Sequence, residues 1–173
     1  QPALTTLPFP LMTTTMRGYG EQLVAGRMTL AEFEVAMRTE LKAGTVAQYR
    51  FAKGGPLAAN DVTSVNDILT RQHEYLSGFL DKVAEGGDLA YIPERAAMYA
   101  GAATEAAAEG RLSSAPDNGT VEWRGPDGAN SCADCLRLIG TYTQTEFAAL
   151  GARPGTVTCG SNCRCQLIIH KAA

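Results

Sequence analysis

Hydrophobic residues recur every three to four positions along three stretches between Thr29 and Glu109, which is the spacing of one face of an α-helix. The first stretch opens where Thr29 and Glu32 fit a capping box, and it closes at the Gly54-Gly55 pair. We therefore expect a long helix that begins at Thr29. Its apolar stripe comprises Leu30, Phe33, Met37, Leu41, Val46 and Tyr49.

The second stretch is the most regular, and it predicts a helix capped by Asn60 or Asp61 that stops at Gly86. Its stripe comprises Val62, Val65, Leu69, Gln72, Leu76, Phe79 and Val83. The third stretch predicts a helix from about Pro93 to Glu109, because proline suits the first turn of a helix. Most apolar positions in this third helix are alanines, which allow helices to pack closely.

Residues 1–20 show no helical period, and residues 1–15 are rich in proline and threonine. Pro2, Pro8 and Pro10 disfavour a helix, while the apolar residues among them are costly to leave in water. We expect residues 1–20 to form an extended arm that lies on a partner chain.

Beyond Gly110 the pattern becomes that of loops and short elements. Thr143 and Glu146 repeat the capping-box pattern and predict a short helix that ends near Leu150. The other expected elements are a strand at 121–123, helical turns within 132–139 and a strand at 166–170.

Together these elements predict a mainly α (α+β) fold in three parts. Residues 1–20 would form the arm, residues 21–110 a helical body, and residues 111–173 a small, loop-rich cysteine module with two short strands.

All cysteines of the chain lie in this last part, as Cys-x-x-Cys, a long spacer, and Cys-x-x-x-Cys-x-Cys. They are Cys132, Cys135, Cys159, Cys163 and Cys165. A structural zinc ion takes four nitrogen or sulfur ligands, which small modules supply as two close groups. Because residues 111–173 contain few large apolar side chains, they need a staple, that is, a bound metal ion or a disulfide that holds the segment together. We expect four of these five cysteines to bind one structural zinc ion.

Two other states of the cysteines remain open, namely disulfides and free thiols, and His170 is a further candidate ligand. An odd number of cysteines and the lack of a signal-peptide pattern favour metal over a secreted disulfide framework. A thioredoxin-like redox site at Cys132 and Cys135 would require a parallel sheet, which the pattern does not predict.

Composition narrows the classes of function. The net charge is −3, and residues 111–173 carry six basic and five acidic side chains, which is a weak basis for binding phosphates. No apolar run approaches the roughly 20 residues of a membrane span. His73 and His170 are the only histidines, and neither sits in a catalytic pattern. We therefore expect no enzymatic activity, no small-molecule substrate and no membrane contact, and we expect Trp123 to pack the module against the helices.

The last part of the chain resembles phage minor head (head morphogenesis) proteins of the Mu F-like type. The resemblance begins at Trp123 and the segment Ser131-Cys132-Ala133-Asp134-Cys135, and it ends in the closing motif Gly155-Thr156-Val157-Thr158-Cys159-Gly160-Ser161-Asn162-Cys163-Arg164-Cys165-Gln166-Leu167. The Asn-Cys-Arg-Cys ending is its most specific piece. The preceding helices are compatible with the same family.

This resemblance implies a structural protein of the virus head, assembled in the host cytoplasm and located in the virion near the portal or the inner capsid. Its partners would be the portal protein, the major capsid protein or both, with at most weak contact to packaged DNA. The alternative is a zinc-knuckle protein that binds nucleic acid during DNA packaging. That reading needs a basic face with aromatic side chains, and residues 111–173 offer few basic residues for one.

Overall fold

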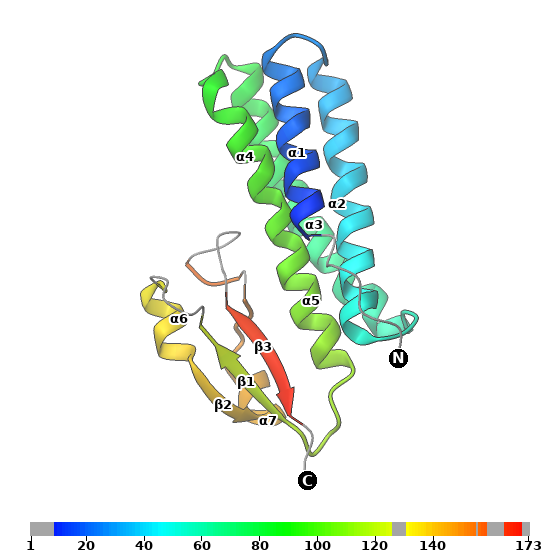
Figure 1. Ribbon diagram of the computed structural model, residues 1–173, viewed down its shortest axis with the longest axis vertical. Helices are drawn as coiled ribbons and strands as arrows, with labels where there is room; N and C mark the ends of the chain where they lie inside the picture. The colour runs from blue at the N-terminus through cyan, green and yellow to red at the C-terminus, as the bar shows by residue number, and fades with distance from the viewer. Residues whose placement is uncertain (1–8, 126–130, 155, 159–164, 171–173) are drawn as a thin grey trace.

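The computed structural model describes residues 9–125, 131–154, 156–158 and 165–170, and it has a helical part and a small sheet-containing part (Figure 1). In the helical part, α1 (Phe9–Val24) packs against α2 (Leu30–Lys53) and α4 (Ile92–Met98). The other long helices are α3 (Ala59–Ala84) and α5 (Ala102–Ser113), both in contact with α2. No described helix combines the length and apolarity needed to cross a lipid bilayer.

Helix α1 contradicts the extended arm predicted for residues 1–20. Residues 9–20 are helical, and Met12 and Met16 are buried in the helical core, while residues 1–8 lie outside the described part. Pro10 is compatible with this helix because it stands in the first turn, where backbone N–H groups have no helical acceptor. The spacing of Met12, Met16 and the half-buried Tyr19 is a helical stripe that the prolines obscured.

The capping chemistry of α2 confirms its predicted start and end. The Thr29 hydroxyl accepts the Glu32 N–H, and the Glu32 carboxylate accepts the Thr29 N–H at 2.8 Å. Gly54 ends the helix with φ of 78°, a left-handed conformation in which glycine is favoured. Glu32 therefore has a lowered pKa, because the Thr29 backbone and hydroxyl groups donate to its carboxylate.

The start of α3 differs from the prediction. Ala58 is the cap residue, and Asp61 lies one turn into the helix, where its carboxylate accepts the Ala58 N–H at 2.6 Å. Val65, Leu69 and Leu76 of the predicted stripe are buried, but Val62 is 45% exposed. The stripe therefore begins one turn later than its sequence pattern indicates.

The third predicted helix is interrupted and longer than expected. A 3-10 turn, η1 (Leu89–Tyr91), leads into α4, and a second one, η2 (Tyr99–Gly101), separates α4 from α5. Helix α5 continues through Gly110 to Ser113, so the loop predicted to start at Gly110 is wrong. A Cβ atom at Gly110 would lie 2.4 Å from the Tyr49 carbonyl oxygen, so this glycine permits close packing of α5 on α2 rather than ending the helix.

The second part contains a three-stranded antiparallel sheet in the order β2-β1-β3, rather than the two strands predicted. Its strands are β1 (Thr120–Arg124), β2 (Gly140–Thr143) and β3 (Gln166–His170), and its helices are α6 (Ala133–Leu138) and α7 (Gln144–Ala149). The missed strand β2 is four residues long and half exposed, so it has no buried apolar run. It ends at Thr143, the predicted cap of α7, whose capping box with Glu146 is present.

Two hydrophobic clusters divide the molecule, and α5 contributes to both. Ala102, Ala103 and Ala106 belong to the cluster of the helical part, whereas Ala108 belongs to the cluster of the sheet. The buried members of the second cluster are Ala108, Val121, Trp123, Cys135, Phe147, Cys165 and Leu167. The predicted cysteine module is therefore packed on the C-terminal half of α5, as Figure 1 shows for the sheet beside this helix.

Candidate metal centre in the cysteine module

The first cysteine pair lies at the start of α6. Cys132 is the cap residue of this helix, and its Sγ accepts the Cys135 N–H at 3.4 Å. Cys135 is 1% exposed, and Cys132 packs on the same cluster at intermediate exposure. The cap contact therefore fixes the Cys132 side chain against the turn that carries Cys135.

Cys165 belongs to the second cysteine group and lies at the end of the sheet where α6 ends. It directly precedes β3, whose first residue, Gln166, is paired with Arg124 at the end of β1. Helix α6 ends just before β2, whose first residue, Gly140, is paired with Trp123. Strand register thus places Cys165 and the end of α6 at one end of the sheet. Figure 1 shows α6 and the start of β3 at this end.

A side-chain clasp connects α6 to the segment that leads into the second cysteine group. The Thr158 hydroxyl donates to the Asp134 carboxylate, to which Arg137 also binds. The Thr158 hydrogen bond and, next, that of Arg137 lower the pKa of Asp134. Because Cys159 directly follows Thr158, this clasp brings the chain to the Cys132–Cys135 turn immediately before the next cysteine.

Of the five predicted metal ligands, Cys132, Cys135 and Cys165 are described, whereas Cys159 and Cys163 lie outside the described residues. Within the described residues, no group of three or more His, Cys, Asp or Glu side chains could hold a metal ion. Cys135 and Cys165 are each 1% exposed. As thiolates, cysteines are the ligands that structural zinc sites use. The zinc site stays a prediction.

His170 does not belong to this centre. It is the last residue of β3 and is paired with Thr120, at the end of the sheet opposite to Cys165. At roughly 3.3 Å per residue, the five positions from Cys165 to His170 span about 16 Å. The His170 imidazole instead lies 2.7 Å from a Glu122 oxygen. Arg124 and then His170 lower the pKa of Glu122 through their hydrogen bonds, so the proposal of His170 as a spare ligand is wrong.

Trp123 is fully buried at the centre of the module. Its ring lies 6.2 Å from that of Phe147, and its cluster includes Ala108 of α5, in agreement with a packing role. Its indole N–H has no hydrogen-bond acceptor among the described residues.

Arg153 makes contacts with Glu109 and Phe147 that the sequence did not indicate. Its Nε donates to Glu109 of α5 at 2.6 Å, and its guanidinium lies 4.9 Å from the centre of the Phe147 ring. It therefore connects the helical part to the core of the module. No local pattern identifies such a residue, because 44 positions separate it from Glu109.

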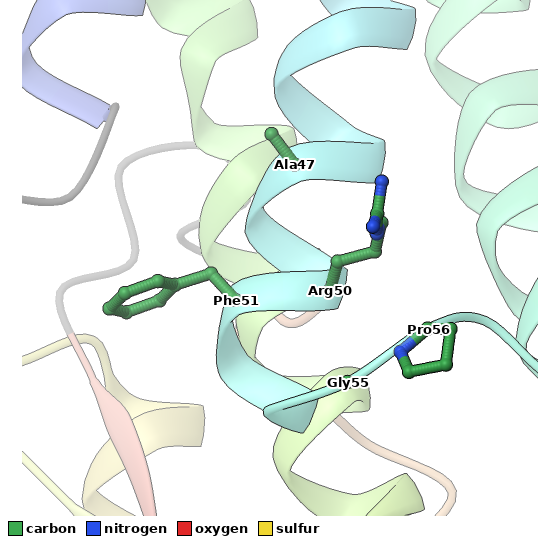
Figure 2. Close-up of a pocket in the computed structure, with 5 residues that line it drawn as sticks. All are labelled: Ala47, Arg50, Phe51, Gly55 and Pro56. Atoms are coloured by element: carbon green, nitrogen blue, oxygen red, sulfur yellow. The ribbon is translucent and has the colours of Figure 1, made fainter. Parts of the chain in front are cut away.

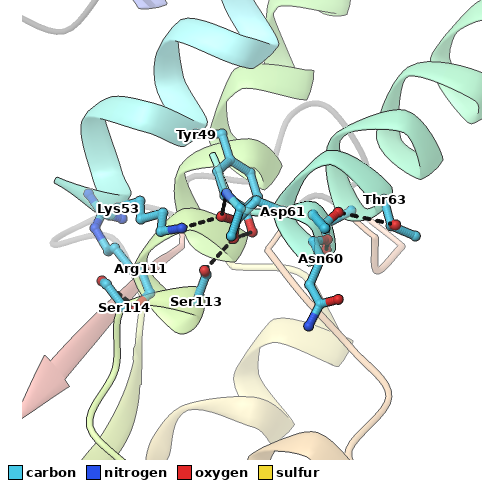
Figure 3. Close-up of polar contacts among 11 residues, drawn as sticks. Tyr49, Lys53, Asn60, Asp61, Thr63, Arg111, Ser113 and Ser114 are labelled. Atoms are coloured by element: carbon cyan, nitrogen blue, oxygen red, sulfur yellow. Dashed lines mark hydrogen bonds and ion pairs between the residues drawn. The ribbon is translucent and has the colours of Figure 1, made fainter. Parts of the chain in front are cut away.

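A second polar cluster surrounds Asp61, where the ends of three helices meet (Figure 3). Tyr49 and Lys53 of α2 and Ser113 of α5 all donate to the Asp61 carboxylate, the Tyr49 hydroxyl at 3.0 Å. Burial alone would raise the pKa of Asp61, but the hydrogen bonds from Lys53, Ser113 and their neighbours hold it well below its usual range. A carboxylate held in its ionised form by several donors suits a structural role better than proton transfer.

Two further features of the helical part lie away from these clusters, namely His73 and a hollow near the end of α2. His73 of α3 is partly buried, and burial, then the charge of Arg38, lowers its pKa. A hollow of about 420 Å³ adjoins Phe51 and Arg50 near the end of α2. Figure 2 shows these two side chains pointing in different directions, so the hollow lacks converging polar groups.

Comparisons of the chain with models of known families, with curated proteins and with solved structures found no match.

Proposed function

We propose that this chain is a structural minor head protein of a tailed bacteriophage, with a helical body that contacts the portal or the inner capsid and a zinc-stapled C-terminal module. The proposal starts from the resemblance in the cysteine motifs. Assembly in the host cytoplasm and a final location in the virion head are parts of the same proposal.

The observation that supports it is that Cys132 and Cys135 of the first cysteine group and Cys165 of the second belong to one hydrophobic cluster. Among the described residues, the cluster of the module has seven buried members, and two of them are cysteines. So small a core gains little from apolar burial, and a tetrahedral zinc ion would stabilise it directly. The Asp134–Thr158 clasp supports the same arrangement, since it connects α6 to the residue before Cys159.

The nucleic-acid alternative has less support. Arg124, Arg137 and Arg153 are paired with Glu122, Asp134 and Glu109 respectively. Arginines engaged in this way are less available for phosphates, whose neutralisation drives binding to nucleic acid. A DNA mobility-shift assay over a salt series distinguishes the two functions, because a head protein without a DNA site should show no salt-dependent shift at moderate protein concentration.

Head incorporation tests the proposal directly. The chain would be expressed together with the portal and major capsid proteins encoded near its gene, and assembled particles would be isolated by sedimentation. We expect the chain to co-sediment with the particles and to contain about one zinc per chain. A matched pair of variants, Cys132→Ser and Ser131→Ala, separates loss of the staple from a general change at this position. Particles without the chain would contradict the head function, and metal-free protein with an intact module would contradict the staple.

A further inference from the structure

A hollow of about 710 Å³ lies between the C-terminal half of α3, the turn that follows it and α4. Its volume falls within the range of roughly 300–1,000 Å³ typical of ligand sites. The residues that matter below are Tyr75, Gly78, Phe79, Lys82, Tyr91 and Arg95. It is formed wholly by the helical part, at the end away from the sheet, where Figure 1 labels α4.

Gly78 opens this hollow. It stands inside α3, yet a Cβ atom built there would meet nothing within 4 Å. Glycine lowers the stability of a helix interior, and neither close packing nor a left-handed conformation requires it here. Tyr75 and Lys82 lie about one turn to either side on the same face. The missing side chain at position 78 therefore leaves open space between them.

The surfaces around Gly78 are aromatic. Tyr75 and Tyr91 are 56% and 53% exposed, whereas Phe79 beneath them is 9% exposed. The Phe79 ring is held from below by the rings of Phe33 and Tyr99, at 6.4 and 6.3 Å between centroids. Two exposed tyrosines above a fixed aromatic floor form the kind of surface on which an inserted apolar side chain contributes most to binding.

The charged residues that line the hollow differ in whether they have a polar partner. Neither Lys82 nor Arg95 forms an ion pair with another residue that the structure describes, whereas Asp88 accepts the Ala90 N–H at 3.0 Å. The Arg95 guanidinium lies 5.7 Å from the centre of the Tyr99 ring and 4.0 Å from the Met98 sulfur, contacts that leave its positive charge without a carboxylate. Glu74 lies eight residues from Lys82 along α3, which is roughly 12 Å. Lys82 and Arg95 both line the hollow and have no ion-pair partner among the described residues, so they can complement a carboxylate.

We propose that this hollow is a docking site for a segment of a partner protein that carries one large aromatic side chain beside a carboxylate. The aromatic side chain lies over Gly78 between Tyr75 and Tyr91, and the carboxylate faces Lys82 and Arg95. This docking site goes beyond the proposed head function and does not depend on the zinc module, because none of the described cysteines lines the hollow.

A pair of capped seven-residue peptides tests the site on the full ¹⁵N-labelled chain by NMR titration. The first has a central tryptophan with an aspartate on each side, and the second has lysines in place of both aspartates. We expect the aspartate peptide to shift the amide signals of Gly78, Lys82 and Gly87 and to bind at least about fivefold more tightly than the lysine peptide. Equal binding of both peptides, or shifts that avoid these amides, would overturn the proposal.

Variants make the test specific to the hollow. Gly78→Trp fills the open space and should weaken binding of the aspartate peptide by about tenfold or more. Gly18→Trp is the matched control, because a Cβ at Gly18 of α1 also meets nothing within 4 Å but lies outside the hollow. Arg95→Gln retains the space and should remove most of the preference for aspartate over lysine. Unchanged binding in both Gly78→Trp and Arg95→Gln would refute the site.

A small-molecule arm identifies the kind of occupant. 3-Phenylpropionate carries an aromatic ring and a carboxylate without a peptide. We expect it to shift the same amide signals but to bind at least about tenfold more weakly than the aspartate peptide, because it makes fewer contacts. Binding as tight as that of the peptide would mean that the hollow is a site for small aromatic acids, and the partner-protein proposal would be wrong.

Discussion

The Asp61 carboxylate accepts a hydrogen bond from the hydroxyl of Ser113, a residue 52 positions further along the chain. Asp61 stands in the first turn of α3 and Ser113 is the last residue of α5. Lys53, at the end of α2, binds the same carboxylate. One side chain therefore joins three helices at the point where α5 passes into the cysteine module.

Asp61→Asn should destabilise the chain by about 3 kcal/mol, since removing one partner of a buried ion pair leaves the other uncompensated. Asp61 is 3% exposed and the Lys53 side chain 18%. Urea denaturation would measure the change. Asp67→Asn, an exposed position on the same helix, should change the free energy of unfolding by less than about 0.5 kcal/mol. Equal effects of the two substitutions would contradict the central role of Asp61.

The same carboxylate should make folding sensitive to acid. Its pKa in the folded chain is lower than the value of about 3.9 in an unfolded chain, so the unfolded state binds the proton first. The contribution of Asp61 is complete above about pH 4 and is lost as the pH falls below it. Unfolding free energies measured from pH 6 downward should therefore decline less steeply in Asp61→Asn than in the parent chain. Parallel curves would show that Asp61 has an ordinary pKa.

Loss of Cys135 should affect the module and spare most of the helices. Cys135 is buried in the cluster of the sheet, whereas the helical part has a separate cluster. In Cys135→Ser we expect loss of bound zinc, faster proteolysis after Gly110, and retention of most of the helical circular dichroism signal. The last turns of α5 should fray, because Ala108 packs in the sheet cluster. Collapse of the whole helical signal would show that the two parts unfold together.

Arg153→Ala should loosen the module from α5. The side chains of Arg153 and Glu109 are 24% and 23% exposed, so their ion pair is partly shielded from water, and the stacking on Phe147 is lost as well. We expect a loss of about 1–2 kcal/mol and faster hydrogen exchange in β3. Arg153→Lys retains only the positive charge, so its free energy of unfolding should lie between those of the parent chain and Arg153→Ala. Arg27→Ala, at an exposed position before α2, is the control that should leave β3 exchange unchanged.

Local chemistry made much of this fold predictable. The capping boxes at Thr29 and Thr143 depend on residues three apart, and both are present where the sequence placed them. The errors occurred where a distant contact decides the outcome. Pro10 indicated an extended arm, but burial of Met12 and Met16 favours a helix. Ser113 and Arg153 bind partners that lie 52 and 44 positions away in the sequence, and no spacing rule detects such contacts.

At the candidate site, too, the sequence predicted local structure but not the arrangement in space. Helical turns were predicted within 132–139, and α6 is present there. His170 was a spare candidate ligand beside the five cysteines. The extended geometry of β3 separates His170 from Cys165, since a strand carries its ends apart much faster than a turn does. Residue type alone therefore suggested a ligand that strand geometry excludes.

Two glycines inside helices should respond oppositely to alanine. A Cβ at Gly110 would lie 2.4 Å from the Tyr49 carbonyl oxygen and 3.2 Å from the Lys53 nitrogen, both backbone atoms that cannot rotate away. A Cβ at Gly78 would meet nothing within 4 Å. Gly78→Ala should therefore stabilise the chain by about 0.5–1 kcal/mol through helix propensity. Gly110→Ala gains the same propensity but must separate α5 from α2.

We expect Gly110→Ala to cost about 1–3 kcal/mol net, because overpacking exceeds the gain in propensity. Thermal and urea unfolding of the two variants beside the parent chain would measure both effects on one scale. The separation of α5 from α2 should also disturb the Asp61 cluster, since Tyr49 and Lys53 bind Asp61 from the same turns that Gly110 approaches. The effects of Gly110→Ala and Asp61→Asn should therefore be less than additive. Stabilisation by alanine at both glycines would show that α5 does not approach α2 as closely as this structure has it.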